Sequence, residues 1–123
     1  MHILLIDDEP AVRDLVQTML AGHTVVAVGS GRAGLDLLDK SDFDVVLTDI
    51  IMPEMEGIEI IMAIRKRLPK IRLVAMSGGG RTGNIDFLSA ASKLGADAIL
   101  RKPFTIGALK KAIGEGEPPA RTS

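Results

Sequence analysis

The sequence contains no cysteine, which excludes a disulfide framework, a thiol nucleophile and a zinc–thiolate site. It also lacks an excess of charge of one sign, since 15 Lys and Arg face 16 Asp and Glu. Nothing in that balance favours direct binding to nucleic acid or to a membrane surface. The N-terminal apolar run, residues 3–6, is too short for a signal peptide or a transmembrane helix. We therefore expect a cytoplasmic protein that does not insert into membranes.

The length and the apolar content suit one globular domain, because 46% of the 123 residues are hydrophobic. We expect this domain over residues 1–114, followed by a flexible C-terminal tail over 115–123 that is rich in Gly, Pro and Glu. If the natural chain ends at Ser123, no output domain follows; if it is longer, residues 115–120 read as the start of a linker.

Short apolar segments alternate with segments of helical spacing along the whole chain. Apolar runs typical of strands buried on both faces occur at residues 3–6, 24–28, 43–49, 71–76 and 98–100. Apolar residues recur at helical spacing after each run, near residues 12–20, 35–38, 57–68, 87–94 and 106–113. Ser30 is placed to cap the second of these helices. The alternation predicts an α/β domain with a five-stranded parallel sheet and helices on both faces.

Polar residues follow four of the five predicted strands. They are Asp7 and Asp8, Asp49, Ser77, and Lys102. Because the carboxyl ends of parallel strands share one edge of a sheet, we expect these side chains to lie close together, where ligands bind in such folds.

Three carboxylates gathered in one place repel one another unless a cation joins them. Oxygen ligands without cysteine or a nearby histidine suit Mg²⁺, with Mn²⁺ as a possible substitute. A carboxylate can also act as a nucleophile and form an acyl phosphate. We expect Asp49 to accept a phosphoryl group, while Ser77, Lys102 and the metal stabilise its oxygens.

Each of these residues also has an ordinary structural interpretation. Asp7 or Asp8 could cap the first helix, and Asp49 could be a turn residue. Ser77 could be a helix cap, and Lys102 a solvated surface lysine. The functional interpretation depends on all of them meeting at one edge of the sheet.

Four segments of the chain resemble the receiver domain of two-component response regulators, over about residues 2–113. They read I-D-D-E-P, L-T-D-I-I-M-P-E-M-E-G, A-M-S-G-G-G and L-R-K-P-F, in the order of that family. The resemblance implies a flavodoxin-like (βα)5 fold with strand order 2-1-3-4-5, an order for which a receiver of this family is a standard example. It also implies a cis peptide bond between Lys102 and Pro103.

The same resemblance assigns roles to individual residues. Asp49 would be phosphorylated from the phosphohistidine of a sensor histidine kinase or phosphotransferase. Asp8, Asp49 and the main-chain carbonyl of Ile51 would bind Mg²⁺ directly, with Asp7 assisting, and Ser77 and Lys102 would hold the phosphoryl group.

The resemblance further implies a protein that catalyses its own phosphorylation and dephosphorylation and is not an ordinary enzyme. A downstream protein would dock on the face of segments 87–94, 98–100 and 106–113, with the protein a monomer or weak homodimer. Many family members carry Tyr or Phe three residues before the lysine, as a rotamer switch, but here that position is Ile99. The glycines after Ser77 favour ordering of that loop as the response instead.

Two other functions are alternatives for this chain. An aspartate-nucleophile phosphatase places D-x-D at the end of the first strand, but this chain has Asp7-Asp8-Glu9 there. A flavin-binding module needs a hydroxyl-rich loop at that point, and the loop is acidic.

Two further motifs could suggest nucleotide or nucleic-acid binding. Residues 29–34 spell G-x-G-x-x-G, a dinucleotide fingerprint, but they follow the second strand and not the first, so capping of a helix explains them better. The basic cluster at residues 65–72 suits a solvated helix end better than a nucleic-acid contact.

Overall fold

The computed structural model describes residues 1–50, 57–78 and 92–115. The strands are β1 (His2–Ile6), β2 (Thr24–Val28), β3 (Val45–Asp49), β4 (Arg72–Gly78) and β5 (Ala98–Lys102). The helices with bounds in these ranges are α1 (Pro10–Met19), α2 (Gly31–Lys40), α3 (Gly57–Arg67) and α5 (Ile106–Ala112). Within the described ranges, no helix has the length and apolar character needed to cross a membrane.

The helix expected over residues 87–94 lies mostly outside the described residues. Ser92 and Lys93 are helical. Gly95 follows them with φ +118°, a conformation that glycine adopts without strain, and this agrees with a helix that ends there.

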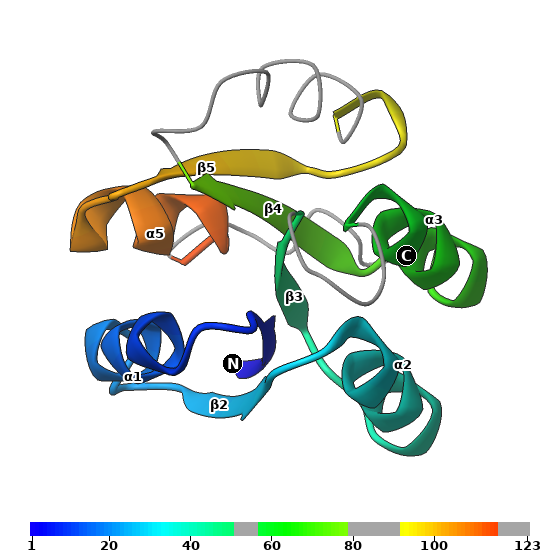
Figure 1. Cartoon of the computed structure of the whole chain (residues 1–123), viewed down its shortest axis with the longest axis horizontal. Helices are drawn as coiled ribbons and strands as arrows, with labels where there is room; N and C mark the ends of the chain where they lie inside the picture. The colour runs from blue at the N-terminus through cyan, green and yellow to red at the C-terminus, as the bar shows by residue number, and fades with distance from the viewer. Residues whose placement is uncertain (51–56, 79–91, 116–123) are drawn as a thin grey trace.

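The five strands form one parallel sheet in the order β2-β1-β3-β4-β5, which confirms the flavodoxin-like order. In Figure 1, α1 and α5 cover one face of the sheet, and α2 and α3 cover the other. The expected α/β architecture with helices on both faces is therefore correct.

The alternation of side chains along each strand divides the core into two halves. Leu4 and Ile6 point into the half under α2 and α3, while Ile3 and Leu5 point into the half that includes residues of α1 and α5. All four side chains are fully buried. This two-sided burial explains why β1 appears in the sequence as an unbroken apolar run.

The start of α2 explains the glycine-rich segment at residues 29–34. The hydroxyl of Ser30 accepts a hydrogen bond from the main-chain N–H of Ala33 at 3.2 Å, which confirms the expected cap. At Gly34, a Cβ atom would lie 2.4 Å from Cδ1 of Ile6. Glycine is therefore needed for the helix to pack this closely on β1.

Two strands extend further than the apolar runs predicted. The run ending at residue 76 continues as strand to Gly78, and β5 continues to Lys102. The pairing of Ser77 with Arg101 and of Gly78 with Lys102 continues the ladder between β4 and β5. Polar residues can occupy these positions because backbone hydrogen bonds, and not apolar burial, define the end of a strand.

Candidate functional site: an acidic cluster at the carboxyl edge of the sheet

Asp7 continues β1 at the carboxyl edge of the sheet and is fully buried. Its main-chain N–H donates to the carbonyl of Val28 at 3.1 Å. One carboxylate oxygen, Oδ1, accepts from the N–H of Glu9 at 2.9 Å, and Oδ2 accepts from Nζ of Lys102 at 2.8 Å. Glu9 is the N-cap residue of α1, with no side-chain cap bond, so neither Asp7 nor the exposed Asp8 caps that helix.

Asp49 is the last residue of β3, and only 3% of it is exposed. The next residue, Ile50, donates its N–H to Met76 at 2.9 Å and accepts at its carbonyl from the N–H of Gly57 at 3.1 Å. A Cβ on Gly57 would lie 2.0 Å from Cα of Ile50, so only glycine fits there. The start of α3 is thereby held against the residue that follows Asp49. Ile51, the expected carbonyl ligand, lies outside the described residues.

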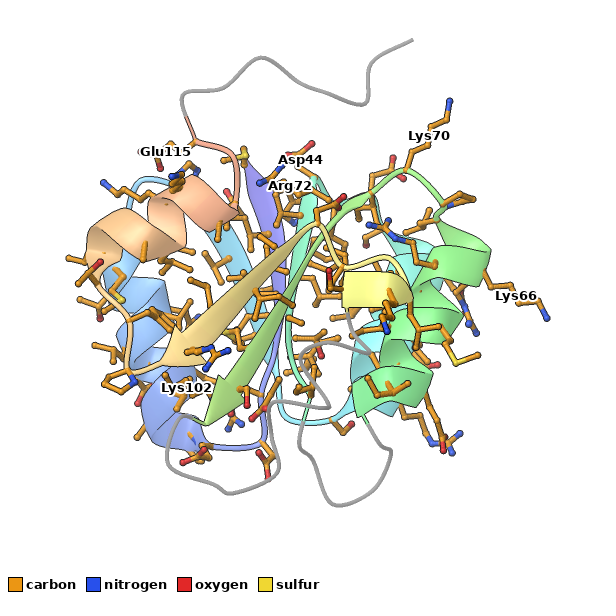
Figure 2. The ribbon with its side chains drawn as sticks, turned by 90° about the horizontal axis from the view of Figure 1, so that it is seen from above. Asp44, Lys66, Lys70, Arg72, Lys102 and Glu115 are labelled. Carbon is orange, nitrogen blue, oxygen red and sulfur yellow. The ribbon has the colours of Figure 1, made fainter. Side chains whose placement is uncertain are left out.

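Lys102 brings a cation to both buried carboxylates. Its Nζ lies 2.8 Å from Oδ2 of Asp7, 3.1 Å from Oδ2 of Asp49 and 3.8 Å from Oε1 of Glu9. Figure 2 shows Lys102 beside the ends of β4 and β5. The peptide bond from Lys102 to Pro103 is cis, as the resemblance implied.

The surroundings of Lys102 keep it charged. Burial by itself lowers the pKa of Lys102. The hydrogen bond to Asp7, together with the negative charges of Asp49 and Asp7, outweighs this effect and raises the pKa above its ordinary value of 10.5. The side chain is therefore an ammonium at neutral pH and can stabilise an anion.

Ser77 lies one position beyond Met76, the residue paired with Asp49 in the sheet. Ser77 is 1% exposed, and its Oγ has no hydrogen-bond partner among the described residues. An unpaired buried hydroxyl is uncommon, because burial without a partner costs about 1–3 kcal/mol. The orphaned hydroxyl is accounted for if its partner belongs to a ligand.

The donor set at this edge suits a hard divalent cation. One carboxylate oxygen from each of Asp7, Asp8, Glu9 and Asp49 lies within 4.8 Å of the others. All of these ligands are oxygens, as Mg²⁺ and Mn²⁺ prefer. Together with the Ser77 hydroxyl, which lacks a partner within the described ranges, these residues fit a metal-assisted phosphoryl site.

Glu9 is the member of this cluster that the sequence interpretation missed. Its only signal is its place directly after Asp7 and Asp8, where it reads as part of a helix start. The short distance between the Glu9 carboxylate and the Lys102 ammonium depends on the packing of β5 beside β4, which the local sequence does not show.

Arg65 and Arg67, in the basic cluster at residues 65–72, have structural partners. Arg65 donates to the carbonyl of Gly95 at 2.8 Å and to Asp97 at 2.7 Å, and Arg67 pairs with Asp39 at 3.0 Å. Figure 2 shows Lys66 and Lys70 extending away from the body of the domain. These contacts agree with the interpretation of residues 65–72 as a helix end.

The comparison with known proteins shows the same fold and family. The family model of the response regulator receiver domain matches residues 3–114. A receiver domain protein from Clostridium thermocellum superposes with a TM-score of 0.84 at 34% identity, covering 91% of this chain and 90% of that one. A probable chemotaxis protein, CheY, of Rhizobium etli is 31% identical over 90% of this chain and 88% of its own length.

A longer relative contains the same domain as one part. The transcriptional regulatory protein GlrR of Escherichia coli is 33% identical over 93% of this chain, which spans 26% of the relative. On the match of the family model and the shared fold, the chain belongs to the family of response regulator receiver domains.

Proposed function

We propose that the chain is a phosphoacceptor of a two-component system, in which Asp49 receives a phosphoryl group from a phosphohistidine of a sensor histidine kinase or phosphotransferase. The observation that carries this proposal is the position of Lys102. Its ammonium contacts the buried carboxylates of Asp7 and Asp49 at the edge of the sheet that also carries Ser77, whose hydroxyl has no partner among the described residues.

The transfer is an in-line displacement at phosphorus. A carboxylate oxygen of Asp49 forms the new P–O bond, the N–P bond of the phosphohistidine breaks, and its electron pair remains on the imidazole nitrogen. Lys102 stabilises one equatorial oxygen of the transferring group, and the Ser77 hydroxyl donates to a second. Asp7, Asp8, Asp49 and the Ile51 carbonyl would hold Mg²⁺, or Mn²⁺ as a substitute, and the bound metal would supply further charge stabilisation to the transferring group.

The modified residue belongs to the protein itself, so the chain is a switch with self-catalysed phosphorylation and dephosphorylation and not an ordinary enzyme. We place it in the cytoplasm, as a monomer or weak homodimer without direct nucleic-acid binding. Its target docks on the face that includes β5 and α5. The docking face expected from the sequence also includes residues 87–94, most of which lie outside the described residues.

The output differs from that of receivers with an aromatic switch. Ile99 pairs with Ala75 in the sheet and packs against the core half under α2 and α3. An aliphatic side chain has no ring to swing between buried and exposed positions. The response expected in its place involves the glycine segment after Ser77, of which residues 79 and 80 lie outside the described residues.

The central test is phosphoryl uptake from a small acyl-phosphate donor with Mg²⁺, followed by intact-protein mass spectrometry. We expect one phosphoryl group on the wild type and none on Asp49→Asn. The matched control is Asp36→Asn, because Asp36 is an exposed aspartate on α2. A phosphoryl group that is still taken up by Asp49→Asn would contradict the proposal. A label that is stable in acid would also contradict it, because an acyl phosphate is not.

A further inference from the structure

Arg13, in the first turn of α1, is bonded to the acidic segment that follows β1, residues 7–9. Its Nη1 donates to the main-chain carbonyl of Asp7 at 2.7 Å. Its own main-chain N–H donates to the carbonyl of Glu9 at 3.1 Å. Both residues that flank Asp8 are therefore bonded to Arg13, one through its side chain and one through its backbone.

The Asp7 carbonyl needs this donor because of where β1 ends. The ladder between β1 and β2 pairs Ile6 with Val28, the last residue of β2, and closes with the bond from Asp7 N–H to Val28. Asp7 is fully buried, so its carbonyl oxygen has little access to water. A charge-assisted bond from a guanidinium satisfies it and is stronger than a neutral one.

The Arg13 guanidinium also packs against Gly29, where the absence of a side chain leaves space for it. A Cβ atom at Gly29 would lie 3.2 Å from Nη1 and 3.8 Å from Cζ of Arg13. Gly29 is the first glycine of the G-x-G-x-x-G segment, and neither the cap at Ser30 nor the packing of Gly34 requires it. Its place beside Arg13 links the turn after β2 to the acidic segment after β1.

We infer that Arg13 is a positioning residue for the metal site. It holds the backbone of Asp7, and so directs that carboxylate and the neighbouring Asp8 toward the bound cation. Arg13 also adds a positive charge near the four clustered carboxylates, as Lys102 does, and so offsets part of their mutual repulsion. This inference rests on the proposed function of the same site.

The test compares Arg13→Met, which keeps the length of the side chain but removes every donor, with Arg13→Lys, which keeps one donor and the charge. The matched control is Arg32→Met, because Arg32 is an exposed arginine on α2. The readouts are the Mg²⁺ dissociation constant by calorimetry, the Asp7 carbonyl ¹³C resonance in the metal-free protein, and the melting temperature.

Groups that orient metal ligands typically contribute about 10–100-fold to affinity. For Arg13→Met we expect the Mg²⁺ dissociation constant to rise about tenfold, at the lower end of that range. The Asp7 carbonyl resonance should shift, and saturating Mg²⁺ should restore most of the phosphoryl uptake. Arg13→Lys should recover most of the affinity, and Arg32→Met should match the wild type. Wild-type affinity in Arg13→Met, or equal weakening in Arg32→Met, overturns the inference.

Gly29→Val provides a second, independent perturbation that leaves Arg13 in place. Its side chain should displace the guanidinium and weaken Mg²⁺ binding in the same direction. In the Arg13→Met background the same change should have no further effect, since coupled residues are not additive. Full additivity of the two changes counts against the inference, and the Gly29→Val arm decides the question if Arg13→Met does not fold.

These measurements separate the inference from the proposed function. If wild-type protein binds Mg²⁺ but takes up no phosphoryl group, the proposed function fails while the Mg²⁺ titrations still test Arg13. If uptake occurs and the affinity of Arg13→Met equals that of the wild type, only the inference fails.

Discussion

The ammonium of Lys102 lies 3.1 Å from Oδ2 of Asp49, although 53 positions separate the two residues in the sequence. The same ammonium contacts Asp7 at 2.8 Å. The cation that the proposed transfer requires is thus already in place before any phosphoryl group arrives. A phosphoryl group on Asp49 would offer new anionic oxygens to a lysine that is already charged and oriented, which lowers the reorganisation that the reaction needs.

Removing the lysine cation should separate metal binding from phosphoryl transfer. In Lys102→Met, the buried carboxylates lose their ion-pair partner, and we expect the metal-free protein to lose about 3 kcal/mol in free energy of unfolding by urea titration. Mg²⁺ should bind more tightly, because the site becomes more negative. Phosphoryl uptake should nevertheless fall by about 100-fold.

The control for this change is Lys111→Met, an exposed lysine on α5. It should leave the stability, the Mg²⁺ affinity and the uptake close to wild-type values. Uptake in Lys102→Met at the wild-type rate would remove Lys102 from the mechanism.

The Ser77 hydroxyl should matter for transfer but not for folding. Because its Oγ has no partner among the described residues, Ser77→Ala should change the free energy of unfolding by less than about 0.5 kcal/mol or stabilise the protein slightly. Phosphoryl uptake should slow by about tenfold or more.

Thr105→Ala is the contrasting variant. Thr105 caps α5 by accepting from the N–H of Ala108 at 3.0 Å, so its loss should cost about 1 kcal/mol and leave uptake unchanged. A stability loss in Ser77→Ala as large as that of Thr105→Ala would mean that the Ser77 hydroxyl has a structural partner.

Gly57 should tolerate no side chain. Because a Cβ there would lie 2.0 Å from the backbone of Ile50, Gly57→Ala must displace main-chain atoms next to Asp49. We expect a loss of about 3 kcal/mol in free energy of unfolding, measured by urea titration, together with weakened uptake.

Gly107→Ala is the matched control, since the nearest atom to a Cβ at Gly107 lies at 3.9 Å. In the helix α5 this change should stabilise the protein by about 0.5–1 kcal/mol. Equal stability of both variants would show that the backbone near Ile50 can move to accept a side chain at residue 57 at little cost in free energy.

The pair formed by His23 and Glu115 predicts a small contribution to stability that is lost in acid. Nε2 of His23 lies 2.6 Å from Oε2 of Glu115, and this hydrogen bond is the main cause that lowers the pKa of Glu115 from 4.5, with the nearby charge of Lys110 adding to it. Because the pKa is lower in the folded state, the stabilisation is present above pH 4.5 and disappears as the pH falls through the lowered value.

Melting temperatures of the wild type and of Glu115→Gln, measured from about pH 6 to about pH 3, should therefore converge at the acid end. Glu115 is exposed, so salt should reduce the difference between the two proteins at the higher pH. A difference that grows toward low pH would contradict this assignment.

Much of the fold could be predicted from local patterns. The apolar runs predicted five strands in a parallel sheet because strands buried on both faces lack polar alternation, as β1 and β3 show. Ser30 was predictable as a cap because a cap acts within a single turn. The strand order could not be derived in this way and came from the family resemblance, because the sequence of a buried strand does not indicate which strands pair with it.

The sequence by itself determined which chemical groups would reach the carboxyl edge of the sheet. Asp7, Asp8, Asp49, Ser77 and Lys102 could be listed because parallel strands place their ends together. Only the tertiary structure decided how those groups pair. Lys102 and Asp7 are 95 positions apart, and the bond of Arg13 to the Asp7 carbonyl depends on the space beside Gly29. Such contacts depend on how side chains from different elements pack together, and the local periodicity of the sequence does not contain that information.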